Sequence, residues 1–127
     1  GEKTTIKKSD AKCINVPICV LVNDYSASAS EAFAGAVKCL GNAKLVGIKT
    51  YGKGVMQDMY PLSDGSAIKI TTSKFNPPVS KNFDGVGVKP DFVVELSAEQ
   101  EKLWYELDAT TDTQLIKAIS VVKALNK

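Results

Sequence analysis

The feature that most constrains the fold of this chain is an apolar run followed closely by a helical pattern. From Val16 to Val22 nearly every residue is β-branched or apolar, as expected for a strand buried on both faces. Asn23-Asp24-Tyr25 ends the run. From Ser28 to Leu40 small and apolar residues recur at helical spacing, and Gly41 is placed to end a helix. The pattern predicts a strand–turn–helix unit whose turn carries three serines suited to capping, at positions 26, 28 and 30.

Further strands are predicted after this unit. Residues 43–48 indicate a second short buried strand. Residues 55–62 and 67–75 alternate in polarity, and the Asp64-Gly65 pair between them is a strong hairpin signal. Residues 92–96 predict one more strand. A strand–turn–helix unit followed by a hairpin is compatible with an α/β domain, but these elements do not by themselves select that architecture.

Two helices are predicted at the end of the chain. Ser97, together with Glu101, indicates the start of the first, and Asp112 the start of the second. The second helix is expected to bury one apolar face, made of Leu115, Ile116, Ile119, Val122 and Leu125.

Composition excludes several classes of function. The net charge of +2 comes from residues of both signs scattered along the chain, so nucleic-acid binding is not implied, and the Lys7-Lys8 doublet is interpreted as a solvated segment. No apolar run reaches membrane-spanning length. Cys13, Cys19 and Cys39 lack metal-type spacing and are interpreted as buried free thiols. The length predicts one domain.

The chain contains no histidine, so a serine nucleophile would need a base other than imidazole. A lysine can act only as the free amine, in a place where burial or a positive neighbour lowers its pKa. A serine at a strand-to-helix turn can present its hydroxyl beside backbone N–H groups aimed at a developing oxyanion. The G-x-S-x-G elbow of the hydrolases does not match, because Ala27 and Ala29 flank Ser28. Local sequence leaves the choice among the three serines open.

Several blocks in a fixed order resemble the carboxy-terminal processing peptidases, also called tail-specific proteases, which are serine peptidases with a Ser-Lys dyad. The blocks are Val22-Asn23-Asp24-Tyr25-Ser26-Ala27-Ser28-Ala29-Ser30-Glu31, Leu45-Val46-Gly47, Thr50-Tyr51-Gly52-Lys53-Gly54-Val55-Met56-Gln57, Pro61-Leu62-Ser63-Asp64-Gly65-Ser66-Ala67, Lys69-Ile70-Thr71-Thr72, Gly85-Val86-Gly87-Val88-Lys89-Pro90-Asp91 and Asp112-Thr113-Gln114-Leu115. Any one block is a weak signal, whereas the ordered set is specific.

The resemblance implies a role for four residues. Ser28 becomes the nucleophile, Lys53 the general base, Gln57 the group that orients the lysine, and the backbone N–H of Ala29 an oxyanion donor. No metal or organic cofactor is required. The implied fold is the α/β architecture shared with the ClpP and crotonase group, built from strand-strand-helix units and incomplete on its N-terminal side. The implied partner is a protein or peptide substrate, and the implied location is the periplasm or cell envelope, or the plant thylakoid lumen.

Two parts of the family pattern have no counterpart between Gly1 and Asn15: the glycine segment that carries the second oxyanion donor, and the upstream PDZ module. We therefore expect residues 1–127 to be the C-terminal part of a serine peptidase domain. Loss of one oxyanion donor typically costs about 10²- to 10³-fold in turnover, so the chain alone is expected to have little activity. The alternative is a peptidase-fold module that binds peptides or apolar ligands without cleaving them.

Structural interpretations compete with each of these roles. Ser28 could simply cap the helix, Lys53 could be a solvated loop residue, and Gln57 could occupy the solvent-facing side of a strand. Glu31 is interpreted as a helix N-terminal charge rather than a third catalytic member. Asp64 and Asp91 are interpreted as turn residues. The aromatic residues expected in the core or an interface are Phe33, Phe75, Phe92 and Trp104. The resemblance leaves open that a few of them line the apolar cleft that the family uses for the ends of its substrates.

Overall fold

The structure is a computed structural model, and it describes residues 4–5, 7–8, 10, 12, 16–41, 43–77 and 82–126. Its strands are β1 (Ile18–Val22), β2 (Ala43–Gly47), β3 (Val55–Pro61), β4 (Ala67–Lys74) and β5 (Phe92–Val93). Its helices are α1 (Ala29–Cys39), α2 (Ala98–Lys102), the 3₁₀ helix η1 (Trp104–Glu106) and α3 (Thr113–Leu125). The predicted α/β class is confirmed.

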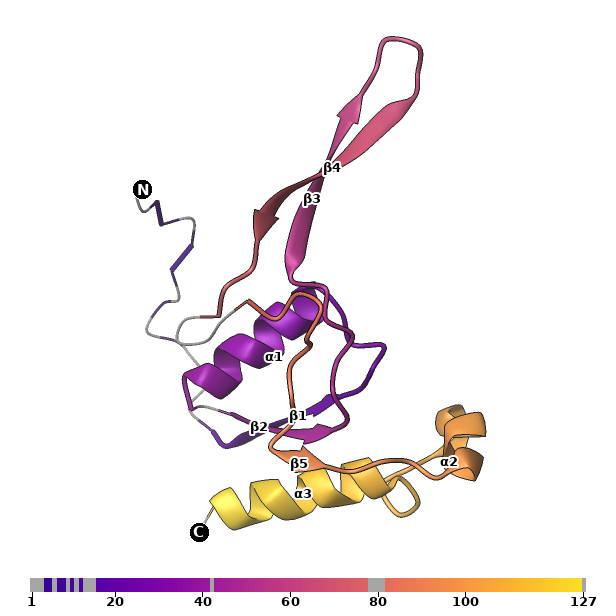
Figure 1. Cartoon of the computed structure of the whole chain (residues 1–127). Coiled ribbons are helices and arrows are strands. Elements are labelled where there is room, and N and C mark those ends of the chain that lie inside the picture. Colours follow the sequence, from indigo (N-terminus) through magenta and orange to yellow (C-terminus); the bar gives the residue numbers. More distant parts are fainter. Residues whose placement is uncertain are drawn as a thin grey trace.

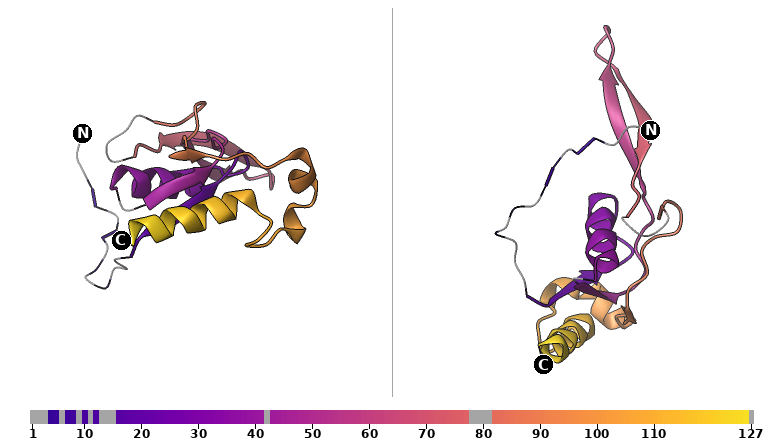
Figure 2. Two further views of the ribbon diagram at one scale, coloured as in Figure 1. Left: turned by 90° about the horizontal axis from the view of Figure 1, so that it is seen from below. Right: turned by 90° about the vertical axis from the view of Figure 1, so that its left-hand side faces the viewer.

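A parallel sheet in the order β1-β2-β5 lies between two helices, with α1 on one face and α3 on the other (Figures 1 and 2). The central strand β2 packs against both helices. Its consecutive residues Leu45 and Val46 point to opposite faces of the sheet, and both are completely buried. Leu45 packs with Ala34 of α1, whereas Val46 packs with Ala118 and Val121 of α3. Burial on both faces is typical of a parallel strand covered by helices.

The prediction of burial on both faces is correct for β2 and wrong for β1. β1 lies at the edge of the described sheet, and its Leu21 is 42% exposed. The strand also begins at Ile18 rather than Val16, which is consistent with Pro17 having no backbone N–H for a strand hydrogen bond.

β5 is shorter than expected because its partner ends. Val94 N donates to Gly47 O at 2.9 Å, and Gly47 is the last residue of β2. From Val94 onward the chain leaves the sheet towards α2, so the predicted strand at residues 92–96 is reduced to Phe92–Val93.

The strands β3 and β4 form a separate antiparallel hairpin that projects away from the sheet (Figure 1). Its turn is the one predicted at Asp64-Gly65, and Gly65 has a φ of 87°. The pairing register shifts between Met56 and Gln57, so that Met56 pairs with Ser73 while Gln57 pairs with Thr71.

The predicted starts of the two C-terminal helices are confirmed. Asp112 caps α3 by accepting hydrogen bonds from Gln114 N and Leu115 N. Ser97 caps α2 and exchanges hydrogen bonds with Gln100, which takes the place expected for Glu101.

The predicted apolar face of α3 is confirmed only in part, because Leu115 and Val122 are half-buried whereas Ile116, Ile119 and Leu125 are exposed. The residues that it buries against the sheet are Ala118 and Val121, while Ile116 and Ile119 are 43% and 37% exposed. In the part of the chain that the structure describes, none of the helices has the length and hydrophobicity to cross a bilayer.

Candidate functional site

Ser28 has a backbone conformation that distinguishes it from the other two serines. It is the N-cap of α1, with φ 56° and ψ −113°, and among the described non-glycine residues it is the one with positive φ. Such a conformation costs about 1 to 3 kcal/mol and is found chiefly where the surroundings impose it. Ser26 instead fixes the preceding turn, since its hydroxyl accepts from Asn23 N at 3.1 Å. Ser30 lies within the helix.

Ala29 is the first helical residue, directly after Ser28. Backbone N–H groups of the first helical turn have no partner inside the helix. Within the described residues no acceptor is paired with the Ala29 N–H. A group that develops negative charge beside Ser28 would therefore meet a free donor at the positive end of the α1 dipole.

Glu31 lies three residues after Ser28 and is completely buried. Its Oε2 accepts from Ser28 N at 3.0 Å and from Lys53 N at 2.7 Å. Its Oε1 accepts from Gly52 N at 2.7 Å and from the Thr50 hydroxyl at 2.5 Å. One carboxylate thus joins the start of α1 to the loop after β2. The prediction that Glu31 is a helix N-terminal charge did not include these hydrogen bonds to the loop after β2.

The loop that carries Lys53 is held from its other side by the turn at residues 82–88. Thr50 N donates to Val88 O at 3.2 Å, and Val88 N donates to the Thr50 hydroxyl at 2.7 Å. Gly85 N donates to Gly52 O at 2.8 Å. Gly54 N donates to the Asp84 carboxylate at 3.0 Å. The backbone of Lys53 is therefore fixed between this turn and Glu31, while its side chain is half-buried.

Gln57 lies beyond this loop, on β3. Its side chain is exposed, and its Nε2 donates to the Thr71 hydroxyl of the paired strand at 3.3 Å. No hydrogen bond in the described part of the chain joins Gln57 to Lys53, or Lys53 Nζ to Ser28. The structure thus brings together the backbones of Ser28 and Lys53, and the orienting role of Gln57 stays a prediction.

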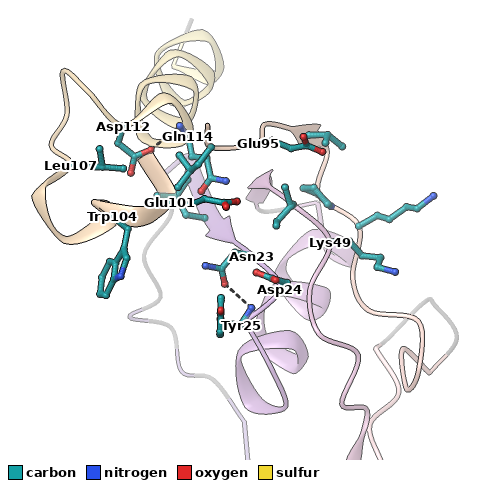
Figure 3. Close-up of a pocket in the computed structure, with 16 residues that line it drawn as sticks. Asn23, Asp24, Tyr25, Lys49, Glu95, Glu101, Trp104, Leu107, Asp112 and Gln114 are labelled. Carbon is teal, nitrogen blue, oxygen red and sulfur yellow. Dashed lines mark hydrogen bonds between the residues drawn. The ribbon is translucent and has the colours of Figure 1, made fainter. Parts of the chain in front are cut away.

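A cavity of about 1210 Å³ lies at the carboxyl ends of β1, β2 and β5 (Figure 3). Tyr25 and Lys49 line it just before the Ser28 turn and the Lys53 loop, and Trp104 of η1 and Leu107 directly after η1 also line it. Neither Ser28 nor Lys53 is among the lining residues. Local sequence patterns do not predict this cavity, because segments distant in the sequence form it.

Two aspartates left out of the catalytic prediction have structural partners. The Asp64 carboxylate accepts from the Ser66 hydroxyl and amide, and these bonds lower the pKa of that carboxyl. Asp91 does more than form a turn: its carboxylate accepts from Leu45 N at 2.8 Å and lies 3.5 Å from Lys38 Nζ on α1. It therefore ties the helix to the sheet.

The remaining predictions on side chains have mixed outcomes. Cys19 and Cys39 are free thiols, but half-buried rather than buried, and burial, followed by the nearby Asp91 charge, raises the pKa of the Cys19 thiol. Cys13 lies outside the described residues. Phe33 and Trp104 are 56% and 70% exposed, so neither is in the core.

Aromatic side chains pack in two places. Phe75 stacks on buried Phe83 with ring centroids 6.5 Å apart. The ammonium of Lys117 on α3 lies 4.9 Å from the centre of the Phe92 ring, so this residue of β5 faces α3.

Comparison with known proteins gives a consistent result. The family described as peptidase family S41 matches residues 1–94. A carboxyl-terminal-processing protease of Picosynechococcus sp. is 38% identical over 109 residues, which is 85% of this chain and 25% of that protein. The chain thus spans a quarter of the length of this curated relative.

Two solved structures share the fold. The photosystem II D1 C-terminal processing protease superposes with a TM-score of 0.59 and 39% identity, over 62% of this chain and 20% of that one. The tricorn protease superposes with a TM-score of 0.64 and 25% identity, over 87% of this chain and 10% of that one.

Proposed function

The chain belongs to peptidase family S41, and from this premise we propose that it supplies the nucleophile and the general base of a serine endopeptidase that trims protein tails. The observation that supports this role is the convergence of Ser28 and Lys53, which are distant in the sequence, on one oxygen of the buried Glu31. Their backbone nitrogens can be no further apart than the sum of the two hydrogen-bond distances.

The proposed reaction uses the side chains of these two residues. Neutral Lys53 takes the proton of the Ser28 hydroxyl as Ser28 attacks a peptide carbonyl. The Ala29 N–H donates to the oxyanion that forms. The Lys53 ammonium then gives the proton to the leaving amine, and water releases the acyl group from Ser28. Gln57 would orient the lysine, which requires its amide to leave Thr71.

We further propose that these 127 residues are the C-terminal part of a larger catalytic domain. The match covers only 25% of the Picosynechococcus relative, which supports a longer parent protein. The second oxyanion donor and a PDZ module would then lie upstream, and the protein would act on protein tails in the periplasm or cell envelope.

Covalent labelling by a small fluorophosphonate, read by intact mass, tests the dyad. The full-length protein is expected to gain one label, and Ser28→Ala and Lys53→Ala to gain none at the same reagent concentration. Ser26→Ala is the matched control. Ser26 lies in the same turn, but its hydroxyl accepts from Asn23 N and its backbone does not have the strained conformation of Ser28. Labelling that persists in folded Ser28→Ala would refute the assignment.

The second candidate function is binding without cleavage. The cavity at the carboxyl ends of β1, β2 and β5 favours this function, since Ser28 and Lys53 do not line that cavity. This function predicts peptide affinity that survives both substitutions, and no label on a well-folded full-length protein.

A further inference from the structure

Glu31 is the most deeply buried charged side chain among the described residues, and the reaction above gives it no step. Taking a carboxylate out of water costs several kcal/mol unless its oxygens find donors. Four donors supply that compensation, together with the positive end of the α1 dipole. A glutamate that only capped a helix could remain at the surface.

The two carboxylate oxygens of Glu31 accept hydrogen bonds from different donors. Oε2 binds the backbone N–H groups of Ser28 and Lys53. Oε1 binds Gly52 N and the hydroxyl of Thr50, a side chain that is 1% exposed. The Thr50 hydroxyl also accepts from Val88 N at 2.7 Å, so its own proton is directed to Glu31. Thr50 therefore fixes the carboxylate with Oε2 facing the two catalytic residues.

We propose that Glu31 is a positioning residue that sets the spacing between the Ser28 nucleophile and the Lys53 base. This inference rests on the proposed function. Glu31 touches neither the substrate nor a reacting atom. It acts through two backbone hydrogen bonds to one oxygen, which fix where the Ser28 and Lys53 side chains begin. Displacement of a catalytic group by about 1 Å can cost about 100-fold in rate.

The test measures how fast Ser28 is labelled by the fluorophosphonate in the full-length protein. Varying the reagent concentration separates the maximal labelling rate from reagent affinity. Glu31→Ala is expected to lower the maximal rate by about 10- to 100-fold and to leave reagent affinity nearly unchanged. Glu31→Gln is expected to retain part of the rate, because its carbonyl oxygen can face Ser28 and Lys53 while its amide nitrogen faces Thr50.

Asp84→Ala is the matched control. The Asp84 carboxylate also holds the Lys53 loop, through Gly54 N, but it does not touch Ser28 or Lys53. A general role in holding the Lys53 loop, without a specific effect on the spacing of Ser28 and Lys53, predicts that Glu31→Ala and Asp84→Ala lower the rate equally once each is corrected for its folded fraction. That equality, or an unchanged maximal rate in Glu31→Ala, would overturn the inference.

A second variant covers the case in which Glu31→Ala does not fold. Glu31→Gln must then label more slowly than the unaltered protein, and a rate equal to the unaltered one overturns the inference. The two proposals fail differently. Absence of any label on the unaltered, folded protein refutes the dyad and with it the positioning role. Rapid labelling of both Glu31 variants refutes only the positioning role.

Discussion

At the residue scale, Ser28 holds a conformation that its side chain opposes. With φ 56° and ψ −113°, it occupies a region where the Cβ atom is crowded and where glycine has no penalty. The Glu31 carboxylate helps to impose this conformation by binding Ser28 N. The chain thus keeps a strained serine at a position where glycine would fit better.

This strain gives a stability prediction. Ser28→Gly is expected to exceed Ser28→Ala in free energy of unfolding by about 1 kcal/mol, because relief of a strained φ outweighs the entropy cost of glycine. Both variants lack the hydroxyl, so the comparison isolates the backbone. Denaturant unfolding of the two variants measures the difference.

Ser30 provides the control for this comparison, because it has helical geometry within α1. There the order is expected to reverse, with Ser30→Gly less stable than Ser30→Ala by about 0.5 to 1 kcal/mol. If Ser28→Gly were also less stable than Ser28→Ala, the conformation of Ser28 would not be strained.

At the element scale, α3 is placed by small side chains rather than by its largest ones. Ala118 and Val121 lie against Val46 of β2, whereas Ile116 and Ile119 remain more than a third exposed. Small residues allow the helix to lie close to the strand, and the larger residues flank the contact.

Substitutions on the two faces of α3 are expected to differ accordingly. Val121→Ala removes two buried methyl groups and should cost about 2 kcal/mol in free energy of unfolding. Ile116→Ala removes more carbon atoms but should cost about 1 kcal/mol or less, since Ile116 is 43% exposed. Thermal or denaturant unfolding tests the order, and a larger loss in Ile116→Ala would restore the face predicted from sequence.

At the scale of the whole molecule, the candidate site is assembled from three separate segments. The start of α1 and the loop at residues 50–54 meet at Glu31, and the turn at residues 82–88 closes on the loop from the other side. Gly87 shows how close this contact is, because a Cβ at that position would lie 2.3 Å from Thr50 O.

Alanine substitutions at two glycines of the same turn distinguish the cost of a steric contact from the cost of backbone strain. Gly85 and Gly87 have φ values of 70° and 77°, but a Cβ at Gly85 would meet nothing within 4 Å. Gly85→Ala is therefore expected to cost about 1 kcal/mol from strain alone. Gly87→Ala should cost clearly more and should also slow the labelling of Ser28, because the turn must move away from Thr50. Equal unfolding free energies and equal labelling rates in the two variants would contradict this account.

Local sequence was enough to predict the features that depend on neighbouring residues. The helix Ala29–Cys39 lies within one residue of its predicted range at each end, and the hairpin turn at Asp64-Gly65 and the cap at Asp112 were predicted from local chemistry. Such signals act over a few residues through backbone geometry and short hydrogen bonds. The resemblance of the ordered blocks predicts the roles of Ser28 and Lys53, and these roles stay predictions.

The contacts between groups that are distant in the sequence became known from the folded chain alone. The burial of Glu31 depends on donors from residues 50–53, the Gln57 amide lies on Thr71 of the facing strand, and the face of α3 is chosen by Val46. A local pattern can show that a side chain is polar or apolar, but it does not carry the register and packing that select its partner. The free energy of burying a charge depends on that partner, so the burial of Glu31 could not be predicted from the residues around it in the sequence.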